Sequence, residues 1–316
     1  MIRRSAVVLG GTGFIGRQVC AVFREAGVRV TPVARGAPRP LDLAAADTGR
    51  LAALLADAAP DVLVNAAGRV WESTEREMLA MNAGFVQRLV DVVAVMPRPP
   101  RLVQIGTVHE YGPVPFGTVI REDREPAPDN AYGRSKLLAT EAVLPAGGTV
   151  LRAGNAFGPG TPRASLLGRV AAALAADRAA RAKGGAAPRA EPLRLGPLRS
   201  HCDFVDVRDV ADAVLAAVRE PASAGRVINI GRGEALPVGH LFDRLVALSG
   251  GAVEVVTSPE RGGAADSKAR WQQLDISLAD RLLGWRPRRG VDESLLDLLA
   301  EVGVSGRDRL LDFNRG

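Results

Sequence analysis

Tyr132 and Lys136 are the two residues of this chain whose types and spacing most directly suggest chemistry. The chain has only two tyrosines and three lysines, and one of each lies in the segment Asn130-Ala-Tyr-Gly-Arg-Ser-Lys136. A spacing of four places both side chains on one face of a helix. An ammonium near a phenol favours the phenolate, so we expect the pKa of Tyr132 to fall below about 10. Such a pair would transfer protons at neutral pH, whereas the alternative is a surface Tyr and Lys on an amphipathic helix.

Thr107 is a third candidate for the same chemistry. It follows the apolar run Leu102-Val-Gln-Ile-Gly106, and a Tyr-Gly pair lies four residues further on. In an open α/β sheet the carboxyl ends of the strands line the ligand crevice. We therefore expect Thr107 to point at the substrate.

A glycine-rich turn near the N-terminus predicts a dinucleotide site. The apolar run Ser5–Leu9 reads as a buried parallel strand, and a helical pattern over 17–26 follows the turn before a second strand at 28–30. Glycines let the backbone approach a pyrophosphate, and the helix N-terminus stabilises its negative charge. The predicted contacts are Gly10, Gly13, Phe14, Ile15 and Gly16.

The residues after the second strand favour NADP over NAD. An NAD site needs an acidic residue there, about 20 residues beyond the glycine turn, to bind the ribose 2′-hydroxyl. The stretch Thr31–Gly36 contains no acid, and the first one downstream is Asp42. Arg35 could instead pair with a 2′-phosphate, and Arg17 could assist it.

Composition narrows the function classes. The chain has 316 residues, of which 47% are hydrophobic, so it can bury a sizeable core. Its apolar runs are of strand length, and Met1-Ile-Arg-Arg leads straight into the first strand, so we expect neither a transmembrane helix nor a signal peptide. Cys20 and Cys202 are too few for a disulfide framework or a metal site. The expected compartment is the cytoplasm.

A formal charge of +6 and a pI of about 10.1 raise the question of nucleic acid. The basic residues are spread along the chain and matched by 35 acidic residues, and aromatic residues are few. We therefore expect no nucleic-acid partner. Ligands that carry phosphate would also explain a basic crevice.

The order of predicted elements is that of a doubly wound α/β fold. Strands near 61–65, 101–105 and 149–152 alternate with helices near 48–58, 73–96 and 130–144. A helix near 164–181, a loop at 184–192, a helix at 206–218 and a strand at 226–230 follow. This predicts a parallel Rossmann sheet from residues 1–155 plus about 203–231. A smaller substrate-binding lobe would comprise about 156–202 plus 232–316.

Several motifs together resemble the extended short-chain dehydrogenase/reductase family, also called the NAD-dependent epimerase/dehydratase family. The resemblance covers nearly the whole chain. Its residues are Gly10–Gly16, Asp42-Leu43, Asn65-Ala66-Ala67, Asn82, Thr107, Tyr132, Lys136, Arg152-x-x-Asn155-x-x-Gly158-Pro159-Gly160, Asp203–Ala211 and Leu283-Gly-Trp-Arg-Pro287.

The resemblance implies roles for these positions. Thr107, Tyr132 and Lys136 match the catalytic Ser/Thr, Tyr and Lys, and the last two also hold the cofactor. Asp42, Leu43, Ala66 and Ala67 match further cofactor contacts. The family also pairs the helices near 75–96 and 130–144 between two subunits, which implies a homodimer.

The resemblance also implies a nucleotide-sugar substrate. The dehydratases of the family place an Asp and a Glu directly after the Thr, but here Val108 and His109 follow, and Val cannot transfer a proton. An NADP site favours a reductase over an epimerase that keeps its NAD. The pattern resembles the dTDP-4-keto-6-deoxyhexose 4-ketoreductases. The alternatives are a nucleotide-sugar epimerase or epimerase-reductase, and a non-catalytic NADP-sensing regulator on the same fold.

The expected substrate contacts are His109, Asn155, Arg163, Arg199 and Arg270. The family usually has Arg before the Asp203–Ala211 block, where this chain has Cys202, so one of the three arginines would contact the diphosphate. One branch of the family, the GDP-fucose synthases, uses a Cys at the position of His109 to epimerise the carbon beside the ketone. His109 could do similar work, or bind substrate, or simply pack.

Overall fold

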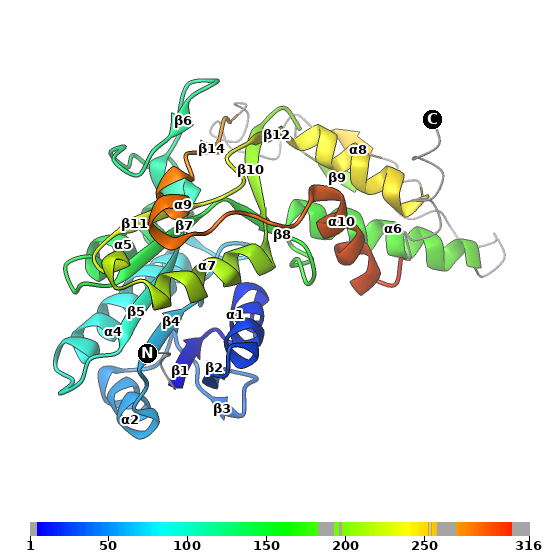
Figure 1. Cartoon of the computed structure of the whole chain (residues 1–316). Coiled ribbons are helices and arrows are strands. Elements are labelled where there is room, and N and C mark those ends of the chain that lie inside the picture. The colour runs from blue at the N-terminus through cyan, green and yellow to red at the C-terminus, as the bar shows by residue number, and fades with distance from the viewer. Residues whose placement is uncertain are drawn as a thin grey trace.

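The computed structural model describes residues 5–182, 193–195, 198–251, 253, 255–257 and 270–304. Its centre is a parallel sheet of seven strands in the order β11-β7-β5-β4-β1-β2-β3 (Figure 1). The strands are β1 (Ser5–Leu9), β2 (Arg29–Ala34), β3 (Arg39–Pro40), β4 (Val62–Asn65), β5 (Arg101–Thr107), β7 (Thr149–Ala153) and β11 (Val227–Ile230). The predicted Rossmann fold is therefore confirmed.

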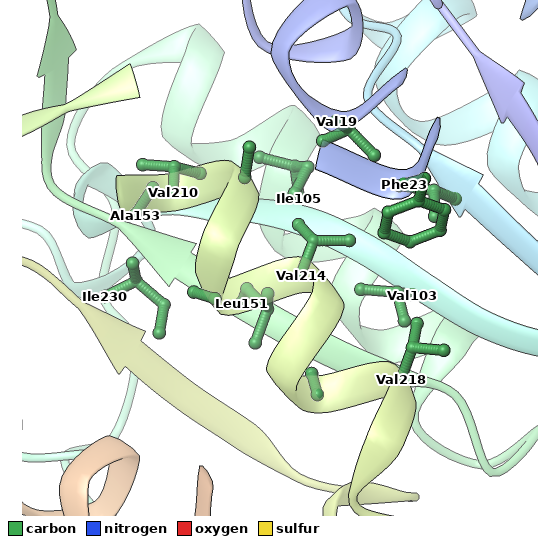
Figure 2. Close-up of a cluster of buried hydrophobic side chains, with 14 of the residues drawn as sticks. Val19, Phe23, Val103, Ile105, Leu151, Ala153, Val210, Val214, Val218 and Ile230 are labelled. Carbon is green, nitrogen blue, oxygen red and sulfur yellow. The ribbon is translucent and has the colours of Figure 1, made fainter. Parts of the chain in front are cut away.

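Helices cover both faces of this sheet. One apolar cluster packs α1 (Phe14–Glu25), α7 (Val207–Arg219) and α9 (Ser277–Leu283) against one face. Figure 2 shows Val210, Val214 and Val218 of α7 turned towards side chains of β5 and β7. A second cluster packs the other face against α2 (Thr48–Ala58), α4 (Phe85–Ala94) and α5 (Ala131–Val143). The apolar periodicity of these helices explains this layering.

The long helix predicted over 73–96 is divided into three parts. It begins as α3 (Glu75–Met78), continues as a π-helix, η1 (Leu79–Gly84), and ends as α4. Thr74 and Glu77 form a capping box that starts it. The π segment contains Asn82, whose side chain accepts a hydrogen bond from Arg69 N at 2.8 Å and donates one to Ser135 Oγ at 2.9 Å. η1 thus ties the loop after β4 to α5.

A third apolar cluster lies at the far end of the molecule (Figure 1). It joins α6 (Leu166–Ala182), α8 (Val238–Ser249) and α10 (Val291–Glu301) to two strands of a small sheet. That sheet contains β8 (Asn155–Phe157), β10 (His201–Asp206) and β12 (Ala235–Pro237). Two further sheets have two short strands each. One pairs β9 (Leu193–Leu195) with β13 (Val255–Thr257), and the other pairs β6 (Val119–Ile120) with β14 (Gln273–Leu274). Two segments are 3₁₀ turns, η2 (Val108–Tyr111) and η3 (Pro221–Ser223).

The structure confirms some of the elements predicted for the second half of the chain and corrects others. Helices predicted at 164–181 and 206–218 are present as α6 and α7, and the strand predicted at 226–230 is β11. Strand β10 was missed, and α9 and Trp285, placed in the lobe by the sequence, pack with the core of the main sheet. The predicted loop at 184–192 lies outside the described residues. The domain boundaries themselves stay a prediction.

Candidate active site

A large cavity lies across the carboxyl ends of the parallel strands. Its volume is about 1160 Å³. It reaches from the glycine turn after β1 to the small sheet and the start of α8. The predicted site residues on its wall are Gly10, Gly13, Phe14, Ile15, Arg35, Asp42, Leu43, Ala66, Ala67, Thr107, His109, Tyr132, Lys136, Asn155 and Arg270. The fold thus brings most of the predicted site together.

The glycine turn has the shape of a phosphate cradle. Gly10 has φ +75°, and a Cβ there would lie 2.8 Å from the Ala67 backbone, so only glycine fits. A Cβ on Gly16 would lie 2.1 Å from the Gly10 carbonyl oxygen, which lets α1 approach β1 closely. Gly13 caps α1 without a side-chain hydrogen bond, so the positive end of the helix faces the cavity. These residues fit the pyrophosphate of a dinucleotide.

Two predicted cofactor residues are absent from the cavity wall. Gly16 acts through packing, as described. The Arg17 side chain does not line the cavity. Its Nη2 donates to the Pro159 carbonyl oxygen at 2.9 Å and lies 3.5 Å from Glu301 Oε1. Arg17 is therefore occupied in joining α1 to the turn after β8. Its predicted assistance to a 2′-phosphate is not supported.

Arg35 follows the last residue of β2 and is exposed at the edge of the cavity. Asp42 lies on the same wall, and its side chain accepts a hydrogen bond from Ala44 N at 3.1 Å. Arg35 is thus placed to meet the part of a ligand that lies beyond the glycine turn, next to the carboxyl end of the second strand.

Helix α5 carries Tyr132 and Lys136 into the cavity wall. Its N-cap is Asn130, whose side chain accepts a hydrogen bond from Gly133 N at 2.8 Å. Lys136 is 4% exposed, and its Nζ donates to the Ile105 carbonyl oxygen at 2.5 Å. The pair therefore faces the end of β5, where Thr107 lies.

The predicted lowering of the Tyr132 pKa is wrong for this structure. Burial raises the pKa of Tyr132 to about 12, and a hydrogen bond with the Thr107 side chain opposes the rise only in part. Burial also lowers the pKa of Lys136 to about 8, against the effect of Glu110. The spacing of four predicts a charge effect, but desolvation dominates because Lys136 is buried and Tyr132 is partly buried. Tyr132 is therefore a phenol at neutral pH.

Thr107 and His109 lie beside Tyr132. The Thr107 hydroxyl accepts a hydrogen bond from His109 N at 3.4 Å. The His109 and Tyr132 rings meet edge-on, with their centroids 5.8 Å apart. Burial first, and then Arg270, lower the pKa of His109 to about 4. The imidazole is thus neutral, and its buried Nδ1 has no hydrogen-bond partner among the described residues.

The predicted substrate residues separate into two groups. Asn155 and Arg270 line the cavity, and Arg270 Nη1 pairs with Asp129 at 3.1 Å. Arg163 and Arg199 are exposed and do not line the cavity. Of the three arginines proposed for a diphosphate, only Arg270 is in position among the described residues.

The structure adds residues that the sequence analysis overlooked. Apolar side chains of the lobe line the distal wall, including Phe157, Leu198, Phe204 and Val238. Glu110 is fully buried, bonds the Thr107 backbone, and does not line the cavity. The spacing Thr-x-x-Glu at 107–110 is a capping-box signal that could have identified it.

The described part of the chain has neither a cluster of metal-ligating side chains nor a membrane-spanning helix. No three His, Cys, Asp or Glu side chains gather there in a way that could hold a metal ion. No helix among those residues is both long and apolar enough to cross a bilayer.

Comparison with known proteins gave consistent matches. Residues 6–231 match the sequence profile of the NAD dependent epimerase/dehydratase family. The dTDP-6-deoxy-L-talose 4-dehydrogenase (NAD(P)(+)) of Kitasatospora kifunensis is 43% identical over 305 residues, covering 92% of this chain and 93% of that protein. The dTDP-L-rhamnose 4-epimerase of Burkholderia thailandensis is 26% identical over 365 aligned positions, covering 93% and 94%. The structure of RMD from Pseudomonas aeruginosa complexed with NADPH superimposes with a TM-score of 0.79 at 24% identity. The match covers 95% of this chain and 98% of that chain, and it shows that the two share a fold.

Proposed function

The chain belongs to the NAD-dependent epimerase/dehydratase family, and we propose that it reduces the C4 ketone of a dTDP-linked 4-keto-6-deoxyhexose with NADPH. Family membership and 43% identity to a named dehydrogenase make it an NAD(P)-dependent oxidoreductase. The alternative of a non-catalytic NADP-sensing regulator is therefore set aside. The direction of the reaction, the choice of NADPH and the sugar are our proposal.

The position of Tyr132 on the cavity wall, hydrogen-bonded to the Thr107 side chain, is the observation that carries the proposed reaction. Reduction of a ketone needs a proton donor, whereas oxidation of an alcohol needs a base. With its pKa raised to about 12, Tyr132 holds its proton at neutral pH. Tyr132 can therefore act as the proton donor that ketone reduction requires.

The proposed mechanism uses three side chains of the chain. When bound, NADPH supplies the hydride to C4. Tyr132 gives its proton to the ketone oxygen as negative charge develops there, and Thr107 donates a hydrogen bond to the same oxygen. Lys136 would stabilise the phenolate left on Tyr132 and would hold the nicotinamide ribose. A proton from solvent then restores Tyr132.

Arg35 supports the choice of NADPH. It lies at the edge of the cavity just beyond β2, and the sequence from Thr31 to Leu41 contains no acidic residue that would bind a 2′-hydroxyl. An exposed guanidinium suits a 2′-phosphate because it can form two parallel hydrogen bonds. Arg35 acts without Arg17, which bonds Pro159 instead.

Two features support a dTDP-linked deoxysugar. The relatives at 43% and 26% identity are named for dTDP-linked sugars and for chemistry at C4, and each covers over nine-tenths of this chain. The cavity offers Arg270 for a diphosphate and the apolar distal wall for a nucleoside. Arg270 would exchange its contact with Asp129 for the ligand, at small cost because that pair is partly exposed.

An epimerase-reductase is the second candidate, and His109 favours it. Its imidazole is neutral, it borders Tyr132, and its Nδ1 has no partner among the described residues. A neutral imidazole could remove a proton from the carbon beside the ketone. Turnover in deuterated water distinguishes the candidates, because only epimerisation exchanges that carbon-bound hydrogen.

The test is a panel of 4-keto-6-deoxyhexoses linked to dTDP or UDP, with NADPH or NADH, and with the product identified by NMR. We expect reduction at C4 of a dTDP-linked member, with NADPH preferred. Tyr132→Phe serves as the inactive control. Failure on every nucleotide-linked ketone, together with reduction of a simple polyketide-type ketone, would overturn the proposed substrate class.

A further inference from the structure

Glu110 is a fully buried carboxylate to which the mechanism above assigns no role. Its exposed fraction is 0%. One carboxylate oxygen, Oε1, accepts a hydrogen bond from the backbone N–H of Thr107 at 2.8 Å. The Thr107 hydroxyl in turn caps the η2 turn that contains Glu110. Each residue thus fixes the backbone of the other, at the point where β5 ends and enters the active site.

The second oxygen, Oε2, reaches two other elements. It accepts from Thr140 Oγ1 at 2.7 Å and from Arg152 Nε at 2.7 Å. Thr140 lies one turn after Lys136 on α5, so the two side chains share a helix face. One carboxylate therefore joins the end of β5, the reactive face of α5 and, through Arg152, strand β7.

The charged and titratable groups around Lys136 come from a few elements. Glu110 approaches from η2, Arg152 from β7, and Tyr132 from the same helix, while His109 precedes Glu110 on η2. Arg152 also lies 4.4 Å above the Tyr111 ring. In this set Glu110 is the group whose negative charge acts on the Lys136 ammonium.

We propose, on the basis of the function above, that Glu110 is a positioning residue of this site. Its carboxylate holds the Thr107 backbone against α5, and its negative charge keeps Lys136 in the ammonium form. Without that charge, burial would lower the lysine pKa further and increase the fraction of neutral amine. An amine would neither stabilise the phenolate of Tyr132 nor keep the donor geometry of an ammonium.

The expected direction of the pKa shift follows from the two opposing influences on Lys136. Burial lowers the pKa of Lys136 to about 8, and Glu110 opposes that fall. Removing the carboxylate should lower the lysine pKa further, by about one unit or more. The alkaline limb of the reduction rate should then move to lower pH by the same amount. At pH 8 the variant should lose about fivefold more rate than at pH 6.

Two variants test this. Glu110→Gln removes the charge but leaves Arg152 buried without its carboxylate, which can prevent folding. The double variant Glu110→Gln with Arg152→Met avoids that problem. Its Gln oxygen can accept from Thr107 N and its amide can donate to Thr140 Oγ1, so the hydrogen bonds survive while both charges are lost.

The direct measurement is the titration of lysine labelled with carbon-13 at Cε. The chain has only three lysines, and Lys136→Arg assigns the signal of interest. Glu122→Gln is the matched control, because Glu122 is a partly buried carboxylate that accepts from Asn229 N, away from Lys136. We expect the Lys136 pKa to fall in Glu110→Gln, to fall by less in the double variant because the Arg152 cation is also lost, and to stay unchanged in Glu122→Gln.

An unchanged Lys136 titration in folded Glu110→Gln, or in both the double variant and Arg152→Met where the single variant does not fold, would overturn the proposed role of the charge. Equal loss of rate at pH 6 and pH 8 would also contradict it and would leave a purely structural role. The titration needs no substrate, so its result stands apart from the choice of sugar. Failure of the sugar panel with a shifted lysine would overturn only the proposed function.

Discussion

Replacing Tyr132 with phenylalanine should remove the proton donor and little else. The Tyr132 ring is partly buried and contacts His109 edge-on, and phenylalanine can keep this contact. The hydroxyl itself is linked to Thr107, on another element. The glycine turn and the loop after β4, which form the cofactor cradle, are untouched by the change.

The expected loss is in kcat rather than in binding. General acid catalysis is worth about 10²–10⁴-fold in rate, or about 3–5 kcal/mol of activation free energy. Burial raises the pKa of Tyr132 to about 12, so nearly every wild-type molecule carries the proton at pH 7. The variant therefore loses the donor in all molecules, and we expect the full effect within that range. Affinity for NADPH should stay within about twofold, because a group that acts in the transition state contributes little to ground-state binding.

The assay is single-turnover reduction of the 4-keto sugar, followed by the loss of reduced nicotinamide absorbance. Tyr111→Phe is the matched control, since the chain has only two tyrosines. The Tyr111 hydroxyl is fully buried and donates to Asn229 Oδ1 at 2.7 Å, outside the cavity wall. Its loss should lower the free energy of unfolding by about 1–3 kcal/mol, because Asn229 Oδ1 loses its donor. The rate should change little.

Two results would refute this reasoning. If Tyr132→Phe reduces the sugar within tenfold of the wild-type rate, the proton comes from elsewhere, and His109 or a substrate hydroxyl becomes the next donor to test. If Tyr111→Phe slows the reaction as much as Tyr132→Phe, the loss reflects distortion of the fold rather than loss of a donor.

Three further outcomes are expected. Arg35→Asp should shift the preference towards NADH, and tighter binding of NADH by the wild type in a titration would contradict the cofactor assignment. The helices near 75–96 and 130–144 should pair two subunits, so light scattering at micromolar concentration should give a dimer, and a monomer would refute this. Burial raises the pKa of Asp203 to about 6, so the folded state binds its proton more tightly than the unfolded state. Its contribution to the unfolding free energy should therefore fall by about 2 kcal/mol as pH rises from 4 to 6, and urea unfolding of Asp203→Asn should lack this fall.

The sheet was largely predictable because its signals are local. Ser5–Leu9 and Thr48–Ala58 begin and end where the sequence places them, since apolar runs and helical periodicity are set within a few residues. Strand β10 was missed because His201–Asp206 pairs with strands distant in sequence, β8 and β12. The π-helix in the middle of the helix over 75–94 leaves no such signal either, because the apolar periodicity continues through it.

The residues on the cavity wall were also largely predictable, but their partners were not. Motif position places Arg17 near the glycine turn, yet its side chain finds the Pro159 carbonyl, 142 residues away. Arg163 and Arg199 have the right charge but remain exposed outside the cavity. A motif fixes where a Cα lies, whereas the direction of a long side chain depends on neighbours brought by the tertiary fold.

The ionisation of the site follows from burial more than from spacing. Desolvation is the largest cause of the shift at Tyr132, Lys136 and His109, and it drives each group towards its neutral form. For Tyr132 and His109 the neutral form is the useful one, since a phenol donates a proton and a neutral imidazole does not repel the ammonium. Lys136 is the exception, because its role needs the charge. The buried carboxylate of Glu110, which bonds the Thr107 backbone, favours that charge, and this is why we propose a positioning role for Glu110 although it lies outside the cavity wall.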